Sequence, residues 1–205
     1  MRKGDLTRQS VVEHAAGLAS RIGLAGITIG TLADDLELSK SGLFAHFRSK
    51  EALQLQVLEH AAARFTEVVI RPALAAPRGE PRLRALFTRW RRWPEESGLP
   101  GGCLFVQASV ELDDQPGPVR DLLARQQRDL LDLVANVAGT GVAEGHFRED
   151  LDVEQLAHDF HGVILAWHHA SRLLRDPKAN ARADTAFEAL LASARRRQPA
   201  RARRT

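Results

Sequence analysis

The chain has 205 residues, of which 44% are hydrophobic and 27% charged, a balance that excludes an intrinsically disordered protein and supplies the core of one or two globular domains. A single Cys excludes an intrachain disulfide, and we find no signal peptide and no apolar run of membrane-spanning length, so we expect a cytoplasmic protein. The net charge of +3 comes from the tail Arg195–Thr205, which holds six Arg and no acid, whereas the preceding part holds 23 basic and 26 acidic residues. A negatively charged partner would therefore be bound by a local patch of basic residues and not attracted by the overall charge of the chain.

The chain begins with a predicted helix over residues 5–20, where apolar side chains recur at helical spacing. Gly23 and Gly26 end it, because glycine readily adopts the backbone conformations found past a helix C-terminus. Thr28 is placed to cap a second helix, since its hydroxyl can accept a hydrogen bond from a backbone N–H that has no intrahelical partner.

A tight turn at Glu37 and Leu38 separates the second helix from a third, which Ser39 can cap, and Ser49 can cap the helix that follows. Leu43 and Phe47 are expected to point inward from this third helix. Its outward face is small and polar and consists of Lys40, Ser41, Gly42, Ala45 and His46. A helix that enters the major groove of DNA needs such a face, although a solvated helix surface is the alternative interpretation.

Two positions beside this helix are suited to hold DNA phosphate. Thr28 and Lys50 lie at predicted helix N-termini, where free backbone N–H groups and the helix dipole favour an anion. Such contacts would orient the module without reading sequence. Thr28 can equally serve as a cap alone.

The run SKSGLFAHF from Ser39 to Phe47, with SKEAL from Ser49 to Leu53, resembles the recognition-helix signature of TetR/AcrR-type transcriptional regulators. Upstream positions resemble the family's first helix and its link to the second: Ala15, Ala16, Leu18, the turn Gly23-Leu24-Ala25-Gly26 and Thr28. The family usually has Tyr at the position of Phe44 and often Thr at that of Gly42, so this chain lacks two hydroxyl groups. We predict these DNA-contacting residues: Thr28, Ser39, Lys40, Ser41, Gly42, Phe44, His46 and Lys50.

The remaining chain also has helical periodicity and no convincing strand, which predicts an all-α fold of about nine helices. Further helices are expected over residues 51–71, 81–93, 103–112, 119–138, 153–174 and 181–197. In the last of them Ala186, Leu190 and Leu191 are expected to point inward. Prolines and glycines are expected to end them, with 139–145 as a loop. We expect a helix-turn-helix DNA-binding domain (1–49), a helical effector-binding and dimerisation domain (50–197) and a basic disordered tail (198–205).

The resemblance implies a homodimer paired through the last two helices and a small-molecule effector bound in the body. Aromatic side chains there suggest an apolar or aromatic ligand, although plain core packing is the alternative for each of them. The candidates are Phe65, Phe87, Trp90, Trp93, Cys103, Phe105 and Trp167.

Two features of the body allow other interpretations. Cys103 stands at a predicted helix start, where its thiolate would be favoured, so it is a candidate sensor of electrophiles or oxidants or else a small buried residue. Four histidines, His158, His161, His168 and His169, share one predicted helix with Leu165 on a face opposite its apolar stripe. We expect these histidines to be interfacial or exposed rather than metal ligands, because a zinc site needs three or four converging donors.

The sequence therefore predicts a regulator, most simply a repressor, that binds a palindromic operator as a dimer and is released by an effector. The competing hypotheses are a ligand-binding or scaffold protein with a silent DNA head, and a Cys-dependent sensor. We expect no enzyme, because no orienting third residue accompanies a Cys103/His pair, and no cofactor.

Overall fold

The computed structural model describes residues 8–195, which form helices and turns with one isolated antiparallel bridge between Phe147 and Arg195. The predicted all-α class is confirmed. When α4 (Lys50–Phe65), the π-helix η1 (Thr66–Ile70) and α5 (Arg71–Leu74) are taken as one continuous helix, the described residues form nine helices. None of the helices within residues 8–195 is long and apolar enough to cross a bilayer. The predicted basic tail, 198–205, lies outside the described residues.

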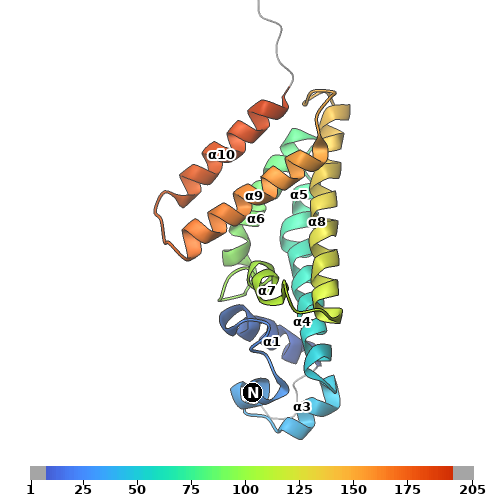
Figure 1. Ribbon diagram of the computed structural model, residues 1–205, viewed down its shortest axis with the longest axis vertical. Coiled ribbons are helices and arrows are strands. Elements are labelled where there is room, and N and C mark those ends of the chain that lie inside the picture. Colours follow the sequence, from blue (N-terminus) through green and yellow to red (C-terminus); the bar gives the residue numbers. More distant parts are fainter. Residues whose placement is uncertain (1–7, 196–205) are drawn as a thin grey trace, which may run out of the picture. The chain divides into compact units, whose positions relative to one another are not determined.

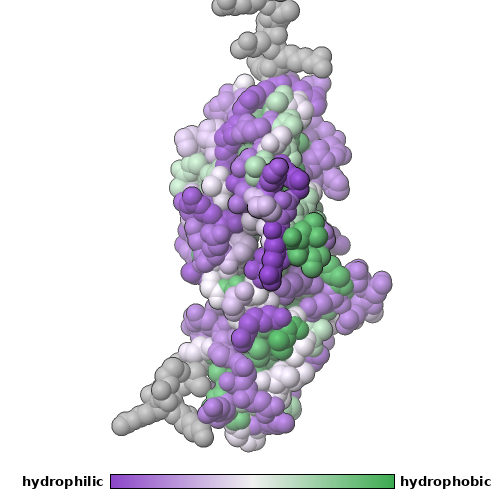
Figure 2. All heavy atoms as spheres, turned by 90° about the vertical axis from the view of Figure 1, so that its left-hand side faces the viewer, coloured by the Kyte–Doolittle hydropathy of each residue, from purple (hydrophilic) through white to green (hydrophobic). Residues whose placement is uncertain are grey.

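The described residues divide into two compact units. The first holds the described chain up to Pro72 together with Arg89–Arg128, and the second holds Ala73–Thr88 with the described chain from Asp129 onward. Figure 1 follows the chain from blue to red. On the face drawn in Figure 2, hydrophilic side chains separate the apolar ones into small patches.

In the first unit, α1 (Arg8–Ile22), α2 (Ile29–Asp35) and α3 (Lys40–Phe47) pack beside the start of α4. Their inward side chains are almost fully buried and include Val11, Ala15, Leu32, Leu43, Phe47, Leu53 and Val57. These are the apolar positions that helical periodicity selects, so burial of one stripe per helix builds this core. The unit also contains α7 (Leu104–Leu112) and parts of α6 (Glu80–Glu96) and α8 (Pro118–Ala143).

The second unit is built around α9 (Val153–Arg172) and α10 (Ala179–Ala194), which form a helical hairpin in Figure 1. Three phenylalanines form its aromatic core. Phe87 stacks on Phe187 with ring centroids 4.0 Å apart, and Phe160 meets both rings edge-on at 5.8–5.9 Å. Such offset and edge-to-face pairs are the favoured arrangements of aromatic rings.

Prolines and glycines end fewer helices than the sequence predicts. Pro72 lies inside α5 and Pro94 inside α6, so the expectations that the helices end before them are wrong. The π-helix just before Pro72 already departs from the regular hydrogen-bond ladder, and Pro94 lies near the end of α6, where the loss of its one backbone donor does not interrupt a long run of helix.

The predicted loop at 139–145 is also wrong, because α8 continues to Ala143. A Cβ on Gly141 would lie 2.4 Å from the Phe147 ring, so this glycine permits close packing inside a helix rather than a turn. Ala186, expected to point inward from the last helix, is exposed, whereas Leu191 is buried.

An ionic network holds the end of α10 within the second unit. Glu80, whose side chain is 15% exposed, accepts hydrogen bonds from Arg84 Nε at 2.8 Å and from Arg195 Nε at 2.9 Å. Arg84 also pairs with the exposed Glu188. Hydrogen bonding from Arg195 is the largest influence on the Glu80 carboxyl and, with Arg84, lowers its pKa from 4.5 to about 2.

We therefore expect Glu80→Gln to destabilise the fold in a pH-dependent way. Since the folded-state pKa is depressed, the stabilisation is present above pH 4.5 and is lost as the pH falls toward 2. At pH 7 the variant should lose up to about 3 kcal/mol of unfolding free energy. Urea titrations followed by circular dichroism between pH 7 and pH 2 measure the difference, with Glu188→Gln as a control of smaller effect. A difference that stays constant across this range would contradict the assignment.

Candidate nucleic-acid interface

Helices α2 and α3 with the turn between them form the helix-turn-helix that the sequence predicts. Thr28 Oγ1 accepts a hydrogen bond from Thr31 N at 3.0 Å, and Thr31 Oγ1 accepts from Thr28 N at 2.9 Å, which completes a capping box. The cap at Thr28 follows from the sequence, but the reciprocal role of Thr31 was missed because Glu or Gln is the usual residue there.

The turn between α2 and α3 contains a residue whose backbone conformation could not be predicted from the sequence. Glu37 has a φ of +53°, a left-handed conformation that usually favours Gly or Asn. It directly follows Leu36, the C-terminal cap of α2. This one left-handed residue reverses the chain so that Ser39 can begin α3.

Ser39 caps α3 as predicted, with its Oγ accepting from Gly42 N at 3.2 Å. Leu43 and Phe47 are each 1% exposed and hold α3 against α1, α2 and the start of α4, which together with α3 we call the DNA head. Every residue predicted for the outward face is exposed: Lys40, Ser41, Gly42, Ala45 and His46. Phe44, also in the predicted DNA set, is 57% exposed.

The next helix begins beside this face. Ser49 caps α4 by accepting from Ala52 N at 3.0 Å, as predicted. Lys50 is exposed, and its Nζ donates to Ala25 O in the α1–α2 turn at 2.7 Å. Thr28 is half-buried. Of the eight predicted DNA-contacting residues, therefore, seven are exposed and all lie on α3 or at the helix starts beside it.

The head thus presents a short, uncrowded helix face with Lys40 in its first turn and His46 in its last. Hydroxyl, ammonium and imidazole groups there can donate to base edges or phosphates, while the exposed Phe44 ring can make only apolar contacts. This arrangement has the small, polar outward face that a helix needs to enter the major groove of DNA.

The predicted effector-binding residues fall into two groups rather than one. In the first unit, the Phe65 ring meets Trp90, Trp93 and Phe105 edge-on, with centroids 5.3, 5.2 and 6.0 Å away. We call these four residues the aromatic cluster. The indole Nε1 of Trp93 is buried near the Cys103 thiol and makes no other hydrogen bond within the described part of the chain. Cys103, the N-terminal cap of α7, is also buried in this unit.

Cys103 does not have the environment of a reactive thiol. Burial raises its pKa and outweighs the opposing influence of the Val106 and Phe105 backbone and of the Trp93 indole. The helix start that suggested an available thiolate is present, but desolvation of the charged form prevails.

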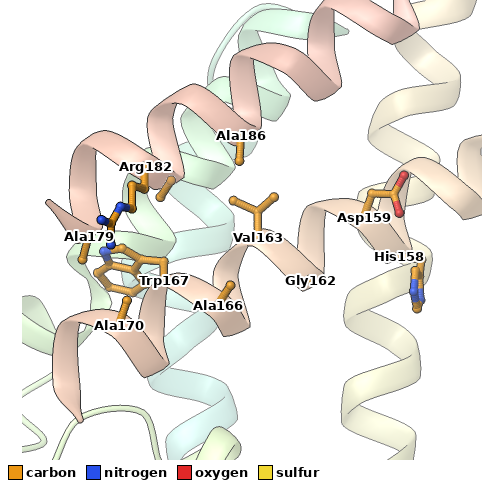
Figure 3. Close-up of a pocket in the computed structure, with 11 residues that line it drawn as sticks. His158, Asp159, Gly162, Val163, Ala166, Trp167, Ala170, Ala179, Arg182 and Ala186 are labelled. Atoms are coloured by element: carbon orange, nitrogen blue, oxygen red, sulfur yellow. The ribbon is translucent and has the colours of Figure 1, made fainter. Parts of the chain in front are cut away.

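The other two candidates, Phe87 and Trp167, belong to the second unit. Phe87 lies in its phenylalanine core, whereas Trp167 donates from Nε1 to Asn180 Oδ1 at 2.9 Å and borders a groove between α9 and α10. The groove encloses about 570 Å³, and Figure 3 shows the side chains that line it. Most are small: Gly162, Val163, Ala166, Ala170, Ala179, Ala183 and Ala186.

The histidines of α9 do not share one environment. His158 lines the groove beside Asp159, whereas burial lowers the pKa of His161 and of His168. Among residues 8–195, no three His, Cys, Asp or Glu side chains are grouped so that they could hold a metal ion.

Comparison with known proteins agrees with this geometry. Residues 11–57 match the model of bacterial regulatory proteins of the tetR family, and residues 79–187 match the tetracyclin repressor-like C-terminal domain. No curated protein matches the chain.

Several solved structures share the fold. A TetR transcriptional regulator from Chloroflexus aurantiacus J-10-FL is 27% identical, with 94% of this chain and 96% of that one covered and a TM-score of 0.79. A TetR-family regulator from Cytophaga hutchinsonii is 20% identical, with coverages of 97% and 99% and a TM-score of 0.78. AibR, solved with isovaleryl coenzyme A and operator DNA, is 19% identical, with coverages of 90% and 97% and a TM-score of 0.71. Because the C-terminal match alone spans more than half of the 205 residues, the chain belongs to the TetR family of transcriptional regulators.

Proposed function

We propose that this regulator is a repressor that binds a palindromic operator as a homodimer and leaves it when a small effector binds. The observation that carries the proposal is the exposed outward face of α3, held in place by Leu43 and Phe47. The proposed contacts are those predicted from the sequence, with Lys40, Ser41, Gly42, Phe44 and His46 facing the groove. Thr28, Ser39 and Lys50 would meet the flanking phosphates.

A single head of this size reads only a few base pairs, so specific binding requires two. A two-fold dimer would place its α3 helices in half-sites about one helical turn apart, roughly 34–36 Å, or a multiple of that distance. The operator would then be a palindrome.

The groove between α9 and α10 supports the dimer. Small side chains such as Ala166, Ala170 and Ala186 let another helix approach closely, and the indole of Trp167, which is 8% exposed, borders the groove beside them (Figure 3). In a two-fold interface each copy presents the same patch, so the α9–α10 hairpins of two chains would pack together.

The aromatic cluster is our proposed contact for the effector. Its rings favour an aromatic or apolar ligand, and the buried Trp93 Nε1 would donate to an acceptor on that ligand. The ligand can release DNA only by binding more tightly to a state whose heads no longer fit the half-sites. AibR was solved with both a coenzyme A thioester and operator DNA, which supports a small-molecule effector here.

Two alternatives have less support. A protein with a silent DNA head is suggested by Phe44 and Gly42, which lack the hydroxyls usual at these positions, but the remaining outward face is exposed and polar. A Cys-dependent sensor is disfavoured by the burial and raised pKa of Cys103.

The first test is Lys40→Ala. We expect operator affinity to fall at least about tenfold, since a charge-assisted contact is lost. If Lys40 contacts phosphate, the slope of log affinity against log salt should also fall by about 1 per head. Fluorescence anisotropy at several salt concentrations measures both, and Lys178→Ala, an exposed lysine of the second unit, is the matched control. Equal operator affinities for Lys40→Ala and Lys178→Ala would exclude α3 as the DNA-contacting helix.

The dimer is tested by a charge in the groove. Ala186→Glu should weaken dimerisation by about a hundredfold or more, because a two-fold interface buries the added carboxylate twice and the neighbouring Arg182 is already paired with Asp176. Ala181→Glu places the same charge on α10 at an exposed position that does not line the groove and should leave the dimer intact. Sedimentation equilibrium distinguishes the variants. A dimer of unchanged strength in Ala186→Glu would exclude this interface.

The sensor alternative is tested by alkylation. In the folded protein, Cys103 should react with iodoacetamide about a hundredfold more slowly than in urea-unfolded chain, because burial both blocks access and suppresses the thiolate. Mass spectrometry of timed samples gives both rates. Similar rates in folded and unfolded protein would revive the sensor hypothesis.

A further inference from the structure

The turn between α1 and α2 is held by a residue from outside the DNA-binding helices. Glu111 on α7 accepts a hydrogen bond from Ala25 N through Oε2 at 2.7 Å. Lys50 Nζ donates to the carbonyl oxygen of the same Ala25, also at 2.7 Å. Both polar groups of this one backbone residue are thus occupied, one by α7 and the other by α4.

The chain around Glu111 is shaped for this contact. Gly23 has a φ of +85°, and a Cβ there would lie 2.2 Å from Glu111 Oε1, so no larger residue leaves room for the carboxylate. Next in the turn, the buried Gln54 side chain donates to Leu24 O at 2.7 Å. The position of the turn is therefore fixed on several sides.

A second contact joins the segment before α7 to the end of α1. Gly101 N donates to Ser20 Oγ at 2.9 Å, and a Cβ on Gly101 would lie 1.5 Å from Ser20 O. Gln107 on α7 donates in turn to Gly101 O at 3.0 Å. Movement of α7 along or away from α1 would disturb both this contact and the one at Ala25.

The opposite end of α7 lies at the aromatic cluster. Phe105 belongs to that cluster, and Glu111 follows it by six residues, a rise of about 9 Å along a helix. One short rigid helix therefore contacts the proposed effector site at its start and the α1–α2 turn near its end.

We propose that Glu111 is a positioning residue for DNA binding. Its hydrogen bond fixes the position of the α1–α2 turn, and with it the position of Lys50, according to how the aromatic cluster packs at the start of α7. The effector and phosphate parts of this inference rest on the proposed function. The mechanical part, coupling between Phe105 and the Ala25 peptide through Glu111, can be tested without DNA or effector.

The DNA-free test is amide hydrogen exchange of the full chain, read at Ala25. Glu111→Ala should speed exchange about tenfold, whereas Val110→Ala, at a neighbouring position that is 72% exposed, should not. Phe105→Leu, which loosens the cluster, should speed exchange at Ala25 when Glu111 is present and have no further effect when it is absent. Equal effects of Phe105→Leu in both backgrounds would overturn the coupling.

The DNA test uses a fragment selected by the wild-type protein. Glu111→Ala should bind it about tenfold more weakly, and Glu111→Gln, whose amide oxygen can still accept from Ala25 N, should recover most of the affinity. A Trp167→Phe background leaves only Trp90 and Trp93 as tryptophans, and because Trp167 borders the proposed dimer groove, sedimentation equilibrium first checks that this variant keeps the wild-type dimer. In that background, DNA binding should change the tryptophan emission when Glu111 is retained and should leave the emission unchanged in Glu111→Ala.

The positioning role would be refuted if Glu111→Ala bound DNA with wild-type affinity and if DNA binding still changed its tryptophan emission as it does when Glu111 is retained. If the wild-type protein selects no fragment, the proposed function fails, while the exchange experiment still decides the coupling.

Discussion

The DNA head depends on the burial of two side chains from a helix too short to persist alone. Helix α3 has eight residues, and isolated helices of this length are unstable in water. Leu43 and Phe47 are each 1% exposed, and burial of two such side chains contributes about 3–6 kcal/mol. The Ser39 cap adds roughly 1 kcal/mol. Because these contacts fix the rotation of α3, they also determine that Lys40, Ser41 and His46 face outward.

The head could be predicted from the sequence because its signals are local. A cap at Thr28, Ser39 or Ser49 needs only a hydroxyl and a backbone N–H within three residues, and the structure confirms all three. The left-handed Glu37 and the reciprocal cap at Thr31 were missed because neither residue is the usual one for its position.

Long-range packing explains what the sequence did not reveal. From the sequence alone, Gly141 is predicted to end a helix and Gly23 to be an ordinary turn residue. The fold shows that Gly141 leaves room for the Phe147 ring and that Gly23 leaves room for the Glu111 carboxylate of α7. The seven effector candidates could be selected by residue type, but only the fold shows that Phe87 and Trp167 belong to a different unit from the aromatic cluster. Cys103 illustrates a competition between two local effects, in which burial prevails over the helix start.

These features together describe how a regulator of this family can divide its tasks. The first unit contains the α3 face, the aromatic cluster and the contacts of Glu111, so reading and sensing can be linked within one compact body. The second unit contains the α9–α10 groove, whose small side chains suit the pairing of two copies, and the ionic network that secures the end of α10.

The most direct measurement of the central claim is selection of genomic fragments by the purified protein at physiological salt, followed by the stoichiometry of binding to any selected fragment. The account predicts a palindrome occupied by two chains, with half-sites about one helical turn apart or a multiple of it. Binding without sequence preference that disappears as salt is raised would show phosphate contacts alone and would contradict a specific operator-binding regulator.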